Sequence, residues 1–272
     1  MLALLISFIK GEIIKMYGRH YGEKNRSVKK RGIVGKIFIF LLFLVFVSAM
    51  VFSGVKIFNW VKENQSSAGV TNDVQKAVST NENNKYEVDF KSLKEKNPDT
   101  VAWFKLEGTN IEYPVVKTTD NEFYMNHSFD KSKNSAGWVF MDYRNKLDGK
   151  DQNMVIYGHN RRDGSMFGTL KKILTKDWLE NTDNFIIPFI TENEKLRYQV
   201  FSVYKIEKEN YYITTNFKTN PEFQEFIDKI KSRSIKNFGI IPRLGDSILT
   251  LSTCADNDNY RVVLHAKKIS EY

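Results

Sequence analysis

The sequence predicts a mostly β domain, folded as a closed or nearly closed barrel and joined to an N-terminal membrane anchor. Two observations lead to this prediction. Residues 37–55 carry no charge, and the chain beyond residue 86 is dense in aromatic and β-branched residues. These residues fall in short segments bounded by Gly, Asn or Asp, a spacing typical of barrels rather than of alternating strand–helix units.

The uncharged segment IFIFLLFLVFVSAMVFSGV spans residues 37–55. Its nineteen residues, at about 1.5 Å each in a helix, nearly cross a hydrocarbon core of about 30 Å. A helix packed on a globular core usually has a polar face, which this segment lacks. A cleaved signal peptide usually has a shorter apolar run, of about 7–15 residues, followed by small residues at the cleavage site. We therefore expect a transmembrane anchor.

Positive charge is concentrated around this anchor. Residues 1–62 have a net charge of +9, equal to that of the whole chain, and residues 1–36 alone have +7. Because cytoplasmic flanks are rich in Lys and Arg, we expect residues 1–36 in the cytoplasm and the C-terminal part outside the cell. These basic residues fit contacts with anionic lipid, so they do not indicate a nucleic-acid partner, and none is expected.

The segments on either side of the anchor are less regular. Residues 1–18 fit either an interfacial helix or a leader that precedes a start at Met16. Residues 56–85 are polar and rich in Ser and Asn, which indicates a stalk that is helical in part. The remaining 187 residues, 86–272, are enough for one extracellular domain with its own core.

Turn residues separate the expected strands of this domain. The strands are 100–106, 111–116, 137–143, 153–158, 184–190, 196–206, 247–254 and 260–269. An amphipathic helix at 219–234, which Thr219 or Asn220 can cap, interrupts them before the last two strands. Two further helices are expected, one before the first strand at 89–97 and one at 165–174.

Cys254, at the end of TLSTC, is the only cysteine of the chain. It cannot form an internal disulfide, so it is a free thiol, an intermolecular bridge or an inert buried residue. An apolar strand precedes it and the polar loop ADNDN follows, so the sulfur is expected at a strand end, where loops build sites. A thiol has a free pKa of about 8.5 and needs a base or a positive field to react near neutral pH.

Histidine is the usual base, and the chain has four. His20 lies on the expected cytoplasmic side, and His127 and His265 fit structural roles. His159 follows the segment NMVIYG, whose last residue, Gly158, permits an unusual backbone before a polar loop. It is therefore the histidine expected to project into a cleft, and the alternative is a loop histidine without a task.

Arg261 begins the last expected strand. A guanidinium stays protonated and offers several donors, so beside a thiol it can stabilise an oxyanion or hold a substrate carbonyl. A rim salt bridge with Asp256 or Asp258 is the alternative. The hairpin register decides which residue faces Cys254: five loop residues place Tyr260 opposite it, and six place Arg261 there.

These segments resemble the sortases, which are membrane-anchored cysteine transpeptidases, and specifically class B. The resemblance rests on TLSTC followed by Arg261, on YGHN about ninety-five residues earlier, and on NPDTVAWFKLEGTNIEYPVV. GSMFGTL after the histidine and the helix before the last two strands point to the same class. The resemblance covers residues 86–272 and implies an eight-stranded β-barrel with N-terminal helices and that extra helix.

The resemblance also implies a catalytic set of Cys254, His159 and Arg261. Class B sortases cut a C-terminal sorting signal of NPxTx type after its threonine. Cys254 would attack the threonine carbonyl, Arg261 would hold the substrate or oxyanion, and His159 would protonate the leaving amine. An amine of the peptidoglycan precursor would then resolve the thioester and join the surface protein to the Gram-positive cell wall.

By the same resemblance, Tyr157 and Ser252 would line the groove beside the catalytic residues, and Asn121 and Met125 would contact the first residues of the signal. Tyr157 and Met125 could equally belong to the core. No Cys/His cluster or carboxylate-rich loop indicates a metal, and no cofactor is expected. Two other functions stay open: a signal-specific cysteine endopeptidase that releases its product to water, and a catalytically silent surface-binding module.

Overall fold

The computed structural model describes residues 31–81, 85–147, 151–254 and 259–271. The chain divides into two compact units, Met1–Ile57 and Phe58–Tyr272. Helix α2, Arg31–Gln75, begins in the first unit and ends in the second. Its large apolar side chains from Ile37 to Val61 are exposed, and by length and composition it is apolar enough to cross a membrane. The helix is therefore consistent with a membrane anchor.

The last part of α2 belongs to the same compact unit as the barrel. Ser67 and Val74 of this part are buried. The backbone carbonyl of Glu63 accepts a hydrogen bond from Asn134 Nδ2 at 3.0 Å. Residues 58–75, whose composition indicates a stalk, are therefore helical, and from Glu63 onward the helix packs in part against this unit.

The second unit continues with short strands and helices. The strands are β1 Val78–Thr80, β2 Tyr86–Val88, β3 Thr100–Leu106, β4 Ile111–Val116, β5 Phe140–Met141, β6 Asn153–His159, β7 Ile186–Ile190, β8 Lys195–Glu207, β9 Ile248–Cys254 and β10 Tyr260–Glu271. The α-helices are α3 Phe90–Lys96, α4 Lys176–Glu180 and α5 Asn220–Ser232. The 3-10 helices are η1 Phe123–Met125, η2 Leu170–Leu174, η3 Thr182–Phe185 and η4 Tyr211–Ile213.

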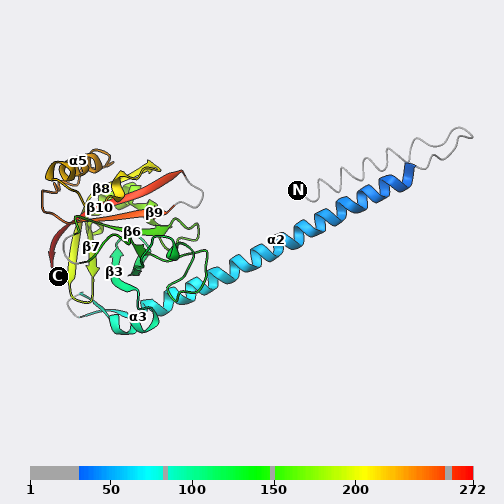
Figure 1. Ribbon diagram of the computed structural model, residues 1–272, viewed down its shortest axis with the longest axis horizontal. Helices are drawn as coiled ribbons and strands as arrows, with labels where there is room; N and C mark the ends of the chain where they lie inside the picture. Colours follow the sequence, from blue (N-terminus) through cyan, green and yellow to red (C-terminus); the bar gives the residue numbers. More distant parts are fainter. Residues whose placement is uncertain (1–30, 82–84, 148–150, 255–258, 272) are drawn as a thin grey trace, which may run out of the picture. The chain divides into compact units, whose positions relative to one another are not determined.

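Eight strands of the described residues close into a barrel in the order β10–β8–β7–β3–β4–β5–β6–β9 (Figure 1). The pairs β4–β5 and β6–β9 are parallel, and the other neighbours are antiparallel. This arrangement confirms the predicted eight-stranded barrel. β1 and β2 form a separate antiparallel pair that the sequence analysis did not predict.

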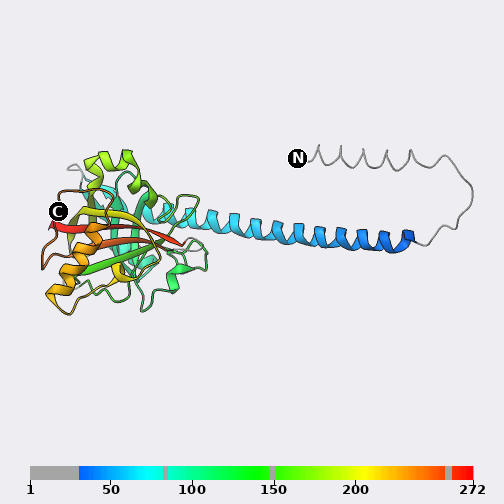
Figure 2. The same cartoon turned by 90° about the horizontal axis from the view of Figure 1, so that it is seen from above.

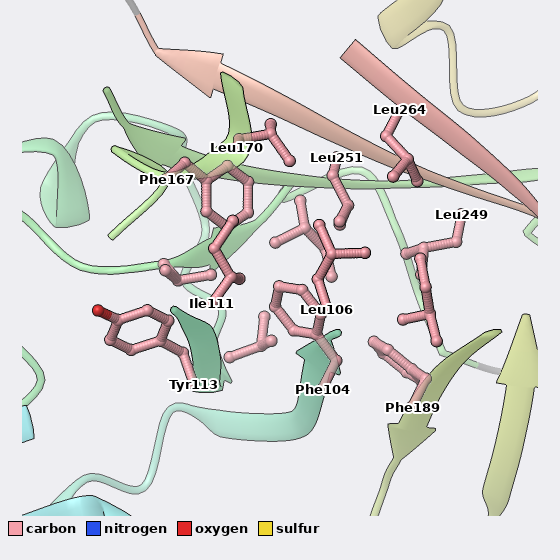
Figure 3. Packing of buried hydrophobic residues seen from close by; sticks show 14 of the residues in the cluster. Phe104, Leu106, Ile111, Tyr113, Phe167, Leu170, Phe189, Leu249, Leu251 and Leu264 are labelled. Atoms are coloured by element: carbon pink, nitrogen blue, oxygen red, sulfur yellow. The ribbon is translucent and has the colours of Figure 1, made fainter. Parts of the chain in front are cut away.

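Alternate side chains of the strands fill the interior of the barrel. Phe104 and Leu106 of β3, Leu249 and Leu251 of β9, and Leu264 of β10 are fully buried in one cluster. Figure 3 shows these side chains pointing toward one another. Burying an apolar side chain of this size contributes about 1.5–3 kcal/mol, so this cluster accounts for much of the stability of the barrel.

The outward residues of β9 and β10 meet α5, which lies alongside these strands (Figure 2, orange). Ile248 of β9 and Val263 of β10 share a second buried cluster with Phe226 and Ile230 of α5. The predicted cap is present, because the Thr219 side chain accepts a hydrogen bond from the first turn of α5. Both α3 and α5 lie where the sequence predicts helices.

The helix predicted at 165–174 is present only in its second half. η2 begins at Leu170 as a 3-10 helix. Met166 has a positive φ of 50°, and the Phe167 N–H donates to the His159 carbonyl at 2.9 Å. The first residues of the segment therefore turn back onto the end of β6 instead of starting a helix.

Candidate active site

The parallel pairing of β6 with β9 defines the centre of the site. Its register pairs Tyr157 with Ser252 and His159 with Cys254. His159 and Cys254 are also the last residues of their strands. Because parallel neighbours end at the same edge of a sheet, this pairing carries a histidine and a cysteine that are far apart in sequence to one strand end. Two of the predicted catalytic residues are therefore strand neighbours.

The antiparallel pairing of β9 with β10 locates Arg261. In this ladder Val263 pairs with Ser252. Extending the register by two residues along each strand places Arg261 opposite Cys254. The alternative register, with Tyr260 opposite Cys254, is inconsistent with this ladder.

A groove of about 270 Å³ opens beside this strand end. The predicted residues in its lining are Asn121, Met125, Tyr157, Ser252 and Arg261. Met125 is 37% exposed, which excludes the alternative that it belongs to the core. Asp256 and Asp258, the alternative partners considered for Arg261, lie outside the described residues.

His159 is almost completely buried, with 3% exposure. Its Nε2 lies 2.6 Å from the backbone carbonyl oxygen of Met125. Because a carbonyl oxygen only accepts hydrogen bonds, Nε2 carries a proton. In a neutral ring with this proton, Nδ1 is the acceptor nitrogen. The ring therefore has a defined tautomer at the strand end.

A buried carboxylate that the sequence analysis missed organises one wall of the groove. Asp142 has a fully buried side chain, which accepts two hydrogen bonds from the Arg144 guanidinium at 2.8 and 2.7 Å. It also accepts from Asn121 Nδ2 at 3.1 Å and from Tyr157 OH at 2.9 Å. Burial alone would raise the pKa of Asp142, but the hydrogen bonds from Arg144 and Tyr157 outweigh burial and lower it. An ionised carboxylate therefore orients Asn121 and Tyr157.

Another part of the groove lining comes from the loop after β8, which the sequence analysis also missed. Residues 208–210, with Tyr212 and Ile213 of η4, line the groove. Tyr212 OH lies 3.2 Å from Ser252 Oγ on the outward face of β9. Asn153 Nδ2 donates to the Tyr212 carbonyl at 3.1 Å, so a buried residue of β6 holds this loop. Little in the sequence indicates that this loop lines the groove, because the loop reaches the site only through the order β8–β10–β9 in the barrel.

The other two described histidines are not register neighbours of Cys254, since His265 pairs with Thr250 and His127 with Lys133. His265 is fully buried in β10, between two hydroxyl groups that each lie 2.8 Å from a ring nitrogen. His127 is half-buried and stacks on Phe123, with 4.0 Å between ring centroids. His20 lies outside the described residues. Of the described histidines, His159 is therefore the register neighbour of Cys254.

Three comparisons relate this chain to known proteins. The sortase domain family model matches residues 104–269. Sortase B of Listeria monocytogenes is 33% identical over 238 residues, which cover 85% of this chain and 96% of that protein. Sortase B of Staphylococcus aureus is 37% identical over 183 residues, which cover 66% and 74%. The crystal structure of sortase B from B. anthracis matches with a TM-score of 0.69 at 31% identity, over 77% of this chain and 99% of that chain.

These matches confirm the resemblance first drawn from TLSTC and YGHN. The region that matches the family model contains both strands that meet at the candidate site. The relatives and the solved structure agree on one class, and the match covers nearly the whole length of two of them. The chain therefore belongs to the sortase B family and is a cysteine transpeptidase.

Proposed function

We propose that Cys254, His159 and Arg261 are the catalytic residues of this transpeptidase. The observation that carries the proposal is the β6–β9 register, which makes His159 the strand neighbour of Cys254. The β9–β10 register supports the third residue, because its extension places Arg261 on the other side of Cys254. The strand registers thus support a site in which all three residues lie at one strand end beside a groove.

In the proposed reaction, Cys254 passes its thiol proton to His159, and its sulfur attacks the threonine carbonyl of a sorting signal. A C–S bond forms and the peptide C–N bond breaks, while His159 gives a proton to the leaving amine. Arg261 donates hydrogen bonds to the carbonyl oxygen as negative charge develops there. An amine of the peptidoglycan precursor then attacks the thioester, which releases the thiol and forms a new amide bond to the surface protein.

The groove is the proposed binding site for a signal of NPxTx type. Asn121 and Met125 contact the first residues of the signal, and Tyr157 and Ser252 contact those next to the scissile bond. The support for this assignment is that all four line one groove. The buried Asp142 carboxylate holds Asn121 and Tyr157 in fixed orientations, which favours recognition of a defined peptide.

The test uses the full-length chain in detergent with a peptide library that varies each position of the NPxTx signal. Each peptide is incubated with and without a panel of primary amines, and the products are analysed by mass spectrometry. We expect cleavage after threonine and an amide adduct with at least one amine. Cleavage that never gives an adduct would support the endopeptidase, and binding without cleavage would support the silent module.

The Cys254→Ala variant is the control for this assay. Removing one sulfur atom at a strand end leaves only a small cavity, so the melting temperature is expected to stay close to that of the wild type. Turnover is expected to disappear because the nucleophile is gone. Undiminished cleavage by the alanine variant would remove Cys254 from the mechanism.

The proposed location is the cell membrane, with residues 1–36 in the cytoplasm and the catalytic domain outside. The exposed apolar surface of α2 and the +7 charge of residues 1–36 support this orientation. Protease added to intact cells without a cell wall is expected to degrade the catalytic domain. Protection of that domain until the cells are lysed would contradict the orientation.

A further inference from the structure

One edge of the His159 ring is held by two neighbours. The Met125 carbonyl oxygen lies 2.6 Å from Nε2. Gly137 approaches the same edge, because a Cβ added to it would lie 2.7 Å from His159 Cδ2, the ring carbon bonded to Nε2. That Cβ would also lie 2.6 Å from the Tyr124 carbonyl oxygen and 2.9 Å from that of Met125. A residue with a side chain therefore does not fit at this position.

The backbone around Gly137 is fixed on both sides. Gly137 has a φ of 60°, in the left-handed region that favours glycine. Its N–H donates to the Asn134 carbonyl at 3.0 Å, and the Trp138 N–H donates to the Tyr124 carbonyl at 2.9 Å. Trp138 is fully buried, and its Nε1 donates to the Pro114 carbonyl at 2.9 Å. An added methyl group would therefore have to displace the His159 ring, the Met125 carbonyl or the Tyr124 carbonyl.

We propose that Gly137 is a positioning residue for His159. By lacking a side chain, it lets the Met125 carbonyl approach Nε2, which fixes the tautomer whose Nδ1 exchanges the catalytic proton. The inference rests on the proposed function of His159 and explains how one of its tautomers is selected. Since a displacement of about 1 Å in a reacting group can lower a rate by about 10²-fold, this contact is expected to matter for turnover.

Gly239 provides a matched control. It also has a positive φ, of 73°, but a Cβ added there would meet no atom within 4 Å. The Gly239→Ala substitution therefore introduces similar backbone strain without touching the site. A comparison of the two alanine variants separates the cost of a left-handed backbone from the effect on the ring.

Both variants are made in the full-length chain and assayed in detergent with an NPxTx peptide. Gly137→Ala is expected to lower kcat/KM by at least about tenfold, mainly through kcat, and to change the pH profile of kcat/KM. Gly239→Ala is expected to keep kcat/KM per folded molecule within about twofold of the wild type, with a smaller fall in melting temperature than Gly137→Ala, because its added Cβ meets no atom within 4 Å. Equal losses in both variants, or an unchanged pH profile in Gly137→Ala, would overturn the proposal.

A measurement on the wild type keeps the inference testable if Gly137→Ala fails to fold. Nitrogen NMR of the histidine-labelled chain reads the tautomer of each ring, and the signal missing from His159→Ala identifies His159. A neutral ring protonated at Nε2 is expected, and protonation at Nδ1 would overturn the positioning role. If His159→Ala retains full turnover while the tautomer is as expected, the proposed function fails and the positioning stands.

Discussion

The outward face of β6, β9 and β10 contains two regions that share sheet geometry but differ in chemistry. At the strand end, His159 and Cys254 are register neighbours beside an open groove. In the middle of the same face, His265 pairs with Thr250 and lies against Phe226 of α5. Both histidines are buried. Burial alone therefore does not distinguish the proposed catalytic histidine from a structural one.

The polar side chains around His265, the region covered by α5, form hydrogen bonds with one another. Thr250 Oγ1 donates to Asn153 Oδ1 at 2.6 Å, so it accepts from His265 Nδ1 at 2.8 Å. His265 Nε2 then accepts from Tyr204 OH, also at 2.8 Å. Burial lowers the pKa of His265 to about 3, so its ring is neutral at physiological pH. Both ring nitrogens are engaged by fixed hydroxyl groups, so this histidine has no route for proton exchange with a substrate.

The strand end differs because it borders an open groove in which a substrate can bind. One edge of the His159 ring is held by a backbone carbonyl, and its strand neighbour is the only cysteine of the chain. The groove beside it is lined by both polar and apolar side chains. In the proposed site, the position of a histidine along its strand, rather than its residue type, decides its role. Substitutions in the two regions, and a change of pH, test this distinction.

His159→Ala is expected to lower kcat/KM by at least about 10²-fold, the usual contribution of general acid–base catalysis. That loss corresponds to about 2.7 kcal/mol of transition-state stabilisation or more. The measurement is kcat/KM on an NPxTx peptide, beside a thermal melt that reports the folded fraction. A loss of less than about tenfold would place His159 in the same structural category as His265.

His265→Ala is expected to cost stability instead of activity. The substitution removes a fully buried ring and leaves the Tyr204 hydroxyl without its acceptor, so we expect a loss of about 3 kcal/mol in the free energy of unfolding. kcat/KM per folded molecule is expected to stay within about threefold of the wild type. A loss of turnover as large as that of His159→Ala would erase the difference between the two regions.

The strand end at His159 and Cys254 could be predicted from the sequence better than the hydrogen-bond network around His265. The segments TLSTC and YGHN show where a strand ends at a polar loop, because in each an apolar segment is followed directly by polar turn residues. The network around His265 is not visible, since Thr250, Asn153 and Tyr204 come from three different strands. Only the closed order of the barrel brings them together.

Long-range contacts account for the other differences between prediction and structure. The sequence left open whether Tyr260 or Arg261 faces Cys254, because register depends on the whole ladder and not on the loop alone. Asp142 was missed because it falls within a segment that resembles a strand, whereas β5 covers only Phe140–Met141. The carboxylate therefore lies just beyond the strand, where it is free to accept hydrogen bonds from two other segments.

Acid is expected to destabilise the region around His265, which α5 covers. The folded pKa of His265, about 3, is below its usual value of 6.5, so the unfolded chain binds a proton first as the pH falls. The contribution is therefore complete above pH 6.5 and is lost as the pH falls from 6.5 toward 3, by about 2 kcal/mol at pH 5. Denaturant unfolding at pH 7 and pH 5 measures it. A His265→Gln variant, which does not titrate, is expected to lose less stability over this interval, and an equal loss would contradict this assignment.

Arg261→Lys tests whether the strand end needs a directed donor or only a positive charge. Lysine keeps the charge but loses the planar fork, so we expect kcat/KM to fall by more than about tenfold without a change in melting temperature. A rim salt bridge would be worth only about 0–1 kcal/mol, which is less than a tenfold effect. Activity within a few-fold of the wild type would show that Arg261 belongs to the scaffold.

The smallest effect is expected for His127→Ala. His127 is half-buried, stacks on Phe123, and donates from Nδ1 to the Phe123 carbonyl at 2.7 Å, so its contacts lie within one turn of chain. Losing one stacking contact and one hydrogen bond at a partly exposed position is expected to cost about 1 kcal/mol of stability. This turn also contains Met125, whose carbonyl holds His159, so the variant tests how far the site depends on its support. We expect kcat/KM to stay within about threefold of the wild type, because Trp138 N–H and the Tyr124 carbonyl hold the turn independently. A loss of turnover close to that of His159→Ala, at an unchanged folded fraction, would show that the site extends to His127.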